Sequence, residues 1–243
     1  MIPKQQAKFV KSLKLKKYRK KASSFLVEGA KNVQELLSAN YDIQHLFVTN
    51  KFLQEYPHFS DIKHELCNEK ELISLGTFQS NEYALAVASM ENQQLDISKF
   101  HFVIALDNVS DPGNLGTIVR IADWYGIDTI LAGTGTADFY SPKVINSSMG
   151  SFARVSVHYL DLDQFFAKIS THRIYGAMLD GNNVHKVNID SPSILLMGNE
   201  SIGISNSLLK YIDYKITIPK IGSAESLNVA VSTAIICDNL FRK

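Results

Sequence analysis

Apolar residues along the chain alternate between short continuous runs and stretches with helical spacing. The runs FVIAL (102–106) and ILLM (194–197) are apolar at every position, which is typical of parallel strands covered on both faces by helices. Between such runs, apolar residues recur every three or four positions and predict helices with one core-facing stripe. The clearest stripe consists of Leu115, Ile118, Val119, Ala122 and Tyr125. This alternation predicts an α/β protein.

The alternation becomes stronger after residue 100, which predicts two domains. Residues 23–95 contain the runs FLVEG, IQHLFVT and YALAVASM and predict a small α/β domain. A polar stretch without apolar periodicity, Glu91–Lys99, is the candidate linker. Residues 100–243 predict a second, larger domain with a parallel sheet.

Composition excludes several classes of protein. With 45% hydrophobic and 20% charged residues, a chain of 243 residues can bury a core without disulfides or metals. The two cysteines, Cys67 and Cys237, lie far apart, and neither they nor the seven histidines show metal-ligand spacing. No apolar run is long enough to span a membrane, and no signal-like segment is present. We therefore expect a soluble, cytoplasmic protein that needs no metal.

Positive charge is concentrated at the N-terminus, in a basic arm that we define as residues 1–22. Nine of the 25 Lys and Arg residues lie there and no acid does, so the remaining chain carries 16 basic against 24 acidic side chains. The cations alternate with Phe9, Leu13, Leu15 and Tyr18, a pattern suited to phosphates and bases, which predicts a nucleic-acid partner. A merely solvated, lysine-rich helix is the alternative. Membrane binding is disfavoured because apolar positions are few.

Polar residues that can bind a ligand or take part in a reaction follow the first strand of the larger domain. Asp107 to Asn114 form a loop that opens a helix, and Asn114 is well placed to cap it. Arg120 projects from the side of that helix opposite the apolar stripe, so it is free to meet a phosphate, an acid or a second subunit. An exposed, solvated arginine is the simpler alternative.

Two later strand ends carry similar groups. Gly198, Asn199 and Glu200 follow a buried strand at the edge where open α/β sheets bind ligands, although Glu200 alternatively caps a helix over residues 204–211. Ser226 and Asn228 open the last helix, whose free amides can bind an acceptor, unless Ser226 simply caps it. That last helix is apolar around most of its circumference, which indicates a second covered surface and a homodimer.

These three segments, taken in order, resemble the three motifs of the SpoU (TrmH) branch of the SPOUT RNA methyltransferases. They are Asn114 to Arg120, Met197 to Glu200, and Ile218-Pro219 through Ser226 to Val229. Residues 24–90 resemble the ribosomal-protein-like substrate-binding domain that precedes many SpoU catalytic domains. The resemblance implies a C-terminal trefoil knot, a homodimer and S-adenosylmethionine as methyl donor.

Residue roles follow from the resemblance by position. Backbone groups of Gly198, Ile218 and Leu227, with neighbouring Met197 and Pro219, are implied to bind S-adenosylmethionine. The implied catalytic residues are Asn114, Arg120, Glu200, Ser226 and Asn228, with Arg120 facing the cofactor pocket of the other protomer. The implied reaction is methyl transfer to a ribose 2′-hydroxyl of RNA, with ribosomal RNA favoured over transfer RNA by the substrate-binding domain.

Two positions depart from the family pattern, and other functions stay open. Ser201 stands where glycine is common. Asn146 stands where a basic residue is frequent, a role that Lys143, Arg154 or the basic arm can take. A non-catalytic RNA-binding or ribosome-assembly protein and a tRNA 2′-O-methyltransferase are the main alternatives. A nucleotide-dependent oxidoreductase lacks its glycine fingerprint.

Overall fold

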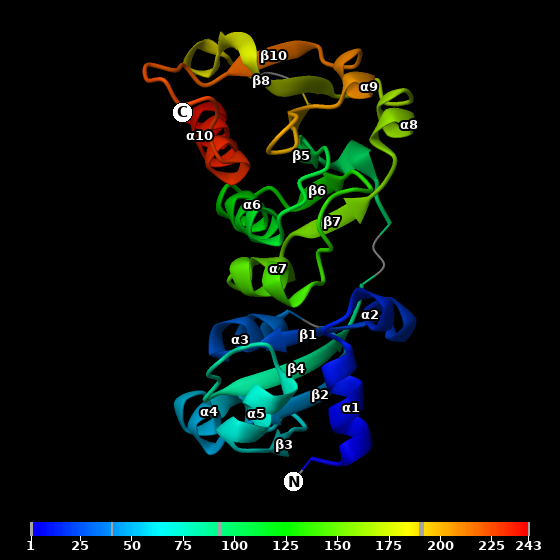
Figure 1. Cartoon of the computed structure of the whole chain (residues 1–243), viewed down its shortest axis with the longest axis vertical. Coiled ribbons are helices and arrows are strands. Elements are labelled where there is room, and N and C mark those ends of the chain that lie inside the picture. Colours follow the sequence, from blue (N-terminus) through cyan, green and yellow to red (C-terminus); the bar gives the residue numbers. More distant parts are fainter. Residues whose placement is uncertain (1, 40, 92–93, 190–191, 243) are drawn as a thin grey trace. The chain divides into compact units, whose positions relative to one another are not determined.

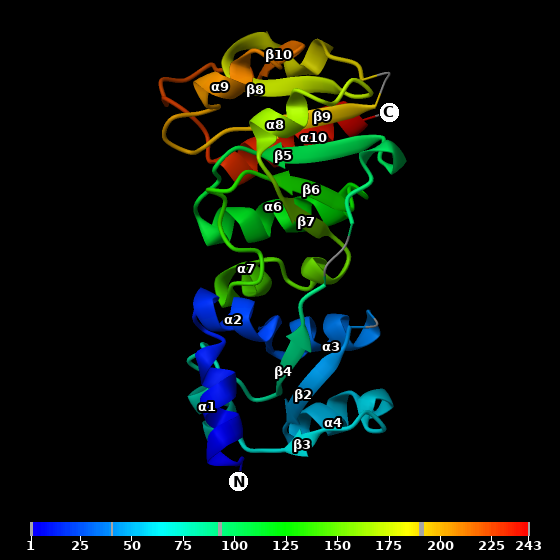
Figure 2. The same cartoon turned by 90° about the vertical axis from the view of Figure 1, so that its right-hand side faces the viewer.

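The computed structural model describes residues 2–39, 41–91, 94–189 and 192–242, which form two compact units. The first contains the described residues of Met1–Asn92 together with Asp138–Ala153, and the second those of Gln93–Ala137 and Arg154–Lys243 (Figures 1 and 2). Of the expected linker, Asn92 and Gln93 lie outside the described residues, and Ile97–Lys99 forms a 3-10 turn. No described helix has the length and apolar character needed to cross a bilayer.

The first unit is built on a four-stranded sheet in the order β1-β4-β2-β3. β4 pairs antiparallel with β1 and β2, and β2 pairs parallel with β3. Its strands are β1 (Ser24–Glu28), β2 (Ile43–Val48), β3 (Glu65–Leu66) and β4 (Ala84–Ser89). Its helices are α1 (Lys4–Ser12), α2 (Lys16–Ala22), α3 (Ala30–Ser38), α4 (Asn50–Glu55), α5 (Glu69–Leu75) and α7 (Pro142–Ser147).

The basic arm forms α1 and α2 and is packed into the first unit. Val10 and Leu13 are fully buried in a core cluster that also contains Leu26, Leu85 and Val87 from β1 and β4. Burial of these apolar side chains fixes which face of α1 points inward and leaves its lysines outside. The arm is therefore part of a folded unit.

One cation of the arm has a structural role. Arg19 is 2% exposed, and its guanidinium donates to the carbonyls of Leu13 and Lys14 at 2.8 and 2.9 Å. It also pairs with Asp138 at 2.6 Å. Asp138 opens the segment 138–153, which follows the second unit's first strands in sequence but folds with the first unit. Arg19 therefore holds this distant segment against the turn between α1 and α2.

Aromatic rings complete the attachment of the segment 138–153. The ring of Phe25 on β1 lies 4.6 Å from that of Tyr140 and 6.1 Å from that of Phe152. Asn32 on α3 donates to Asn146 Oδ1 at 3.4 Å, so the residue that departs from the family's basic position is engaged inside this unit.

The second unit confirms the predicted α/β class with a parallel sheet. Six strands pair parallel throughout, in the order β10-β8-β9-β5-β6-β7. They are β5 (Phe102–Leu106), β6 (Thr129–Ala132), β7 (Ser156–Tyr159), β8 (Arg173–Asn183), β9 (Ser193–Met197) and β10 (Tyr214–Thr217). The helices are α6 (Pro112–Trp124), α8 (Leu162–Phe166), α9 (Asn206–Leu209) and α10 (Val229–Phe241). β5 and β9, at the centre, are almost wholly buried, as their continuous apolar runs predict.

Helices cover both faces of this sheet. Figure 1 shows α6 and α10 together on one face and α8 with α9 on the other. The predicted stripe of α6 is confirmed for Leu115, Ile118, Val119 and Ala122, which are fully buried, whereas Tyr125 ends the helix half-buried. Arg120 is exposed, as predicted.

The helix caps differ from the sequence-based expectations. Asp111, and not Asn114, caps α6, because Pro112 occupies the first turn and sets the start three residues earlier. Asn228, and not Ser226, caps α10. Glu200 caps no helix, since α9 starts after Ser205. Asn114, Ser226 and Glu200 are thereby left for other contacts.

Replacing Asp138 with alanine tests the buried ion pair. The variant leaves the Arg19 guanidinium buried without a counter-charge, so we expect the free energy of unfolding of the first unit to fall by about 3 kcal/mol. Chemical denaturation followed by circular dichroism measures the loss. Glu82→Ala is the matched control, because it breaks an exposed pair with Lys51 in the same unit and should cost far less. Equal losses in the two variants would contradict a structural role for Arg19.

Candidate active site

Three loops of the second unit meet through a chain of side-chain hydrogen bonds. Asn228, at the start of α10, donates to Asn114 Oδ1 at 2.9 Å. Asn114, in the first turn of α6, donates in turn to Glu200 Oε1, also at 2.9 Å. Asn114 and Asn228 are 114 positions apart in the sequence, and Asn114 and Glu200 are 86 apart. Each residue comes from a different predicted motif. The structure therefore brings together three of the five predicted catalytic residues.

Backbone contacts fix the orientation of these side chains. Asn228 Oδ1 accepts from the amides of Ala230 and Val231 at 3.0 and 3.3 Å, so its amide group has only the nitrogen left to offer Asn114. The amide of Asn114 donates to Asp111 Oδ1 at 2.9 Å. Helix capping thus sets the direction in which each amide side chain points.

The loop that carries Glu200 is a closed, tight turn. Asn199 and Gly203 exchange backbone hydrogen bonds of 2.9 and 3.0 Å. A Cβ on Gly198 would lie 2.2 Å from the carbonyl carbon of Gly203, so only glycine permits this close approach. The left-handed conformation falls on Gly203, with φ of +70°, and not on Ser201. Serine is therefore tolerated without strain at that family-variant position.

The other two predicted catalytic residues lie outside the hydrogen-bond chain. Arg120 and Ser226 are both exposed, and neither side chain makes a hydrogen bond or ion pair with any residue that the structure describes. Arg120 lies nearly two turns beyond Asn114 on α6. Its charge is available to a ligand or to another molecule. Arg154, by contrast, is engaged with Asp123, at 2.8 Å.

The predicted cofactor residues lie at the ends of β9 and β10. Met197 is buried, and its carbonyl accepts from the amide of Asp107 at 2.8 Å. Ile218 is half-buried and Pro219 exposed directly after β10, and Leu227 is 50% exposed just before the cap of α10.

The segment between β10 and α10 fits S-adenosylmethionine by its chemistry. Along residues 220–227, no backbone amide donates a hydrogen bond to another described residue. The apolar side chains of Ile221 and Leu227 are exposed on the same segment. Free amides and carbonyls beside apolar side chains match a ligand with a polar amino-acid part and a flat purine.

Sequence reasoning missed the residues that support this site. Asp107 and Asn108, directly after β5, and Ser205, at the end of the Glu200 loop, form hydrogen bonds that join the loops. The sequence does mark Asp107, since it is an acid at the carboxyl end of a buried strand, where ligands bind. No local pattern marks Ser205, because its partner Asp107 lies 98 residues away.

Comparison with known proteins gives matches over nearly the whole chain. A family model described as the SpoU rRNA Methylase family matches residues 101–238, and one described as the MRM3-like substrate binding domain matches residues 4–85. The 23S rRNA (guanosine(2553)-2'-O)-methyltransferase RlmP of Bacillus subtilis is 31% identical over 239 residues, which cover 97% of this chain and 96% of that protein.

Solved structures agree with this assignment. A protein of the TrmH family from Porphyromonas gingivalis is 36% identical and superposes with a TM-score of 0.88 over 98% of both chains. The SpoU methyltransferase AviRb from Streptomyces viridochromogenes, solved with AdoMet, is 25% identical with a TM-score of 0.85 over 99% of this chain and 98% of its own. These matches confirm the resemblance and, at the level of the family, the expectation of an S-adenosylmethionine-dependent methyltransferase. The chain belongs to the SpoU rRNA methylase family.

Proposed function

We propose that this protein transfers a methyl group from S-adenosylmethionine to a ribose 2′-hydroxyl of ribosomal RNA in the cytoplasm. The observation that carries the proposal is the hydrogen-bond chain Asn228–Asn114–Glu200, which joins the three family motifs in one site. Similarity to RlmP over almost the full length supports ribosomal RNA over transfer RNA. The complete set of polar site residues favours an enzyme over a non-catalytic RNA-binding protein on the same fold.

When bound, S-adenosylmethionine supplies a methyl group on a sulfonium, which is already a good leaving group. Backbone groups at Gly198, Ile218 and Leu227 would hold it, together with those of Met197 and Pro219. Glu200 accepts from Asn114 through one carboxylate oxygen and offers its other oxygen to the substrate. Ser226, exposed beside Asn228, presents a hydroxyl to the same site.

Arg120 cannot act as a simple base, because a guanidinium keeps its proton at all physiological pH values and only donates. We infer that it binds the RNA phosphate next to the reacting ribose and stabilises the negative charge that develops on the 2′-oxygen. That phosphate or a water molecule takes the proton. Its exposure on α6 and its lack of a partner among the described residues support this role.

The active form in this proposal is a homodimer in which Arg120 serves the cofactor pocket of the second protomer. Apolar side chains remain exposed on and beside α6 and α10, where a second copy covers them: Trp124 at 81%, Leu227 at 50%, Val231 at 48% and Phe241 at 39%. Exposed apolar surface of this kind marks protein interfaces. A trefoil knot at the carboxyl end is part of the proposal, as the family resemblance implies.

Lysines of α1, α2 and the turn between them form the proposed RNA-binding surface of the first unit. Eight lysines point outward or are half-buried, and none forms an ion pair with a described residue: Lys4, Lys8, Lys11, Lys14, Lys16, Lys17, Lys20 and Lys21. Tyr18 and Leu15 are exposed among them at 42% and 60%. Phosphate neutralisation by such lysines gives affinity without sequence preference.

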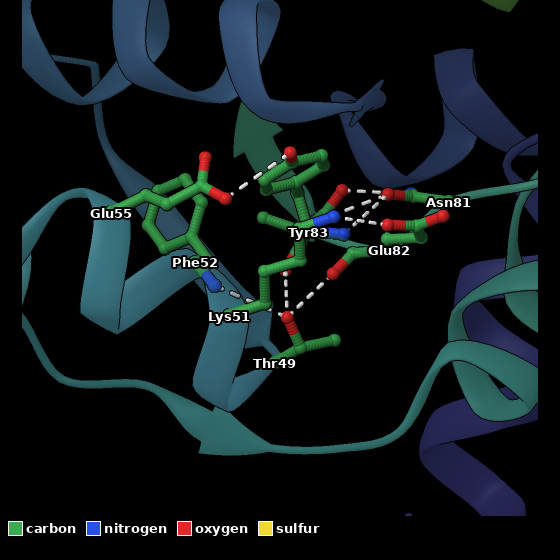
Figure 3. Close-up of polar contacts among 8 residues, drawn as sticks. Thr49, Lys51, Phe52, Glu55, Asn81, Glu82 and Tyr83 are labelled. Atoms are coloured by element: carbon green, nitrogen blue, oxygen red, sulfur yellow. Dashed lines mark hydrogen bonds and ion pairs between the residues drawn. The ribbon is translucent and has the colours of Figure 1, made fainter.

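Lys51 of the same unit differs from these lysines, because an acidic side chain neutralises its charge. Figure 3 shows it in an ion pair with Glu82 and over the ring of Tyr83, whose centroid lies 4.7 Å from Nζ. The Glu82 carboxylate raises the pKa of Lys51 above its usual value. Thr49 caps α4 and accepts from the amide of Phe52, which fixes this cluster. Lys51 is therefore bound to its own acid and is not part of the proposed surface.

The reaction itself is tested by incubating the purified protein with S-adenosylmethionine and either 23S rRNA or a tRNA pool, followed by mapping of ribose methylation. The proposal expects 2′-O-methylation of the rRNA at a defined nucleotide. Methylation of tRNA alone would favour the tRNA alternative. Cofactor binding without methylation of either RNA would favour the non-catalytic alternative.

Replacing Arg120 with lysine should lower kcat by about 100-fold or more, because the planar two-pronged donor is lost at the developing charge. The affinity for S-adenosylmethionine, measured by calorimetry, should not change. Arg173→Lys is the control, since it makes the same exchange at an exposed arginine paired with Asp213. An unchanged rate for Arg120→Lys would refute the role given to Arg120.

Replacing Lys16, Lys17, Lys20 and Lys21 with alanine should weaken RNA binding and flatten its dependence on salt. The slope of log affinity against log salt should fall by roughly 0.7 to 0.9 for each phosphate that the variant no longer neutralises. Thermal unfolding and cofactor binding should be retained, because these side chains are exposed. Lys51→Ala should leave the slope unchanged. A slope that does not move in the fourfold variant would remove α2 from the RNA-binding surface.

A further inference from the structure

We propose that Asp107 is a positioning residue, whose buried carboxylate closes the Glu200 loop and so sets the contact between Glu200 and Asn114. The inference rests on the proposed function for the role of Glu200, but the closure of the loop stands on its own contacts. Asp107 follows β5 and is only 4% exposed.

Asp107 holds both ends of the loop that runs from Met197 to Ser205. Its backbone amide donates to the carbonyl of Met197 at 2.8 Å, where the loop begins. Its carboxylate Oδ2 accepts from the amide of Ser205 at 2.6 Å and from the Ser205 hydroxyl, where the loop ends. One residue therefore fixes the distance between the two ends of the turn that carries Gly198 and Glu200.

Asn108 extends these contacts to two further loops. Its carbonyl accepts from the side chain of Asn199 at 2.8 Å, inside the Glu200 loop. Its side-chain nitrogen donates to Asp107 Oδ1 at 2.8 Å, and its Oδ1 accepts from the amide of Gly135 at 3.1 Å, after β6. Asn108 adopts a left-handed conformation with φ of +58°, which asparagine tolerates better than most residues. The Asp107-Asn108 pair thus joins the loops that follow β5, β6 and β9.

The energetic cost of this arrangement argues for a role beyond stability. Asp107 is buried and forms no ion pair with a cation among the residues that the structure describes. A buried carboxylate without a counter-ion costs more than a neutral acceptor of the same shape. Its strong charge-assisted hydrogen bonds with Ser205 hold the loop in a single conformation. Such preorganisation is what a site needs when Glu200 must meet its substrate in a fixed position.

Asp107→Asn provides the main test, because it keeps the shape of the side chain and removes its charge. Hydrogen exchange of the amides of residues 199–205, measured on the full chain without RNA, should speed up by at least tenfold. Ser205→Ala, which removes only the hydroxyl contact, should give a smaller increase in the same amides. Asp161→Asn is the matched control: Asp161 also accepts a backbone amide at the start of a helix, that of Gln164, in the same unit.

Kinetics then separate a positioning role from a general loss of stability. If Asp107 acts through Glu200, the double variant Asp107→Asn/Glu200→Gln should be no slower than Glu200→Gln alone. Losses that multiply in the double variant, or loop exchange that stays at the level of the control, would overturn the proposal. Faster loop exchange with full activity in both Asp107→Asn and Glu200→Gln would remove Glu200 from the proposed mechanism and Asp107 from any role in the reaction.

Discussion

The common direction of the six strands is the constraint on which the site depends. Because β5, β6, β9 and β10 all run parallel, the residues that follow them emerge at the same edge of the sheet. Asp107, Gly135, Glu200 and Ile218 come from four separate stretches of sequence, and an antiparallel arrangement would place some of them at the opposite edge. Continuous apolar runs are typical of such strands, because the helices that connect parallel strands cover both faces of the sheet. The hydrophobic pattern of the strands is therefore linked to the edge of the sheet at which the candidate site lies.

Asparagine connects the fold to the chemistry, because its side chain both accepts and donates. At Asn228 the oxygen caps α10 while the nitrogen reaches Asn114, so the start of the last helix and the site share one side chain. Serine would supply the cap with a shorter reach, and aspartate would have no proton to donate. Asn108 combines the two functions in the same way, donating to Asp107 and accepting from Gly135. Disturbing one of these amides is expected to affect both local structure and function.

The sequence predicted much of the fold and the site where local pattern decides them. Buried strands and the stripe of α6 follow from short-range spacing. The three motifs come from the resemblance to the SpoU family, and the structure joins one residue of each, Asn114, Glu200 and Asn228. Cap positions were wrong by a few residues because several capping residue types compete within one turn, and Pro112 decided the start of α6. The burial of Arg19 and the attachment of residues 138–153 to the first unit depend on partners 119 positions apart, which no local pattern encodes. Asp107 shows the same limit, since only its long-range contact with Ser205 reveals its role.

Positive charge is concentrated in the basic arm, away in sequence from the residues of the candidate active site. The basic arm supplies eight lysines that have no acidic partner within the described part of the chain, whereas the chain after residue 21 carries a formal net charge of −8. The proposed site contains acidic side chains, among them Glu200 and the buried Asp107, so it offers little general attraction to a polyanion. In the proposed function, RNA affinity therefore comes mainly from the lysines and falls with salt, while the reaction step depends on short contacts that salt screens far less. Arg120 is an exposed cation in this acidic part of the chain. In the proposed mechanism its contribution is to position one phosphate, because a single charge adds little to the binding of a whole RNA.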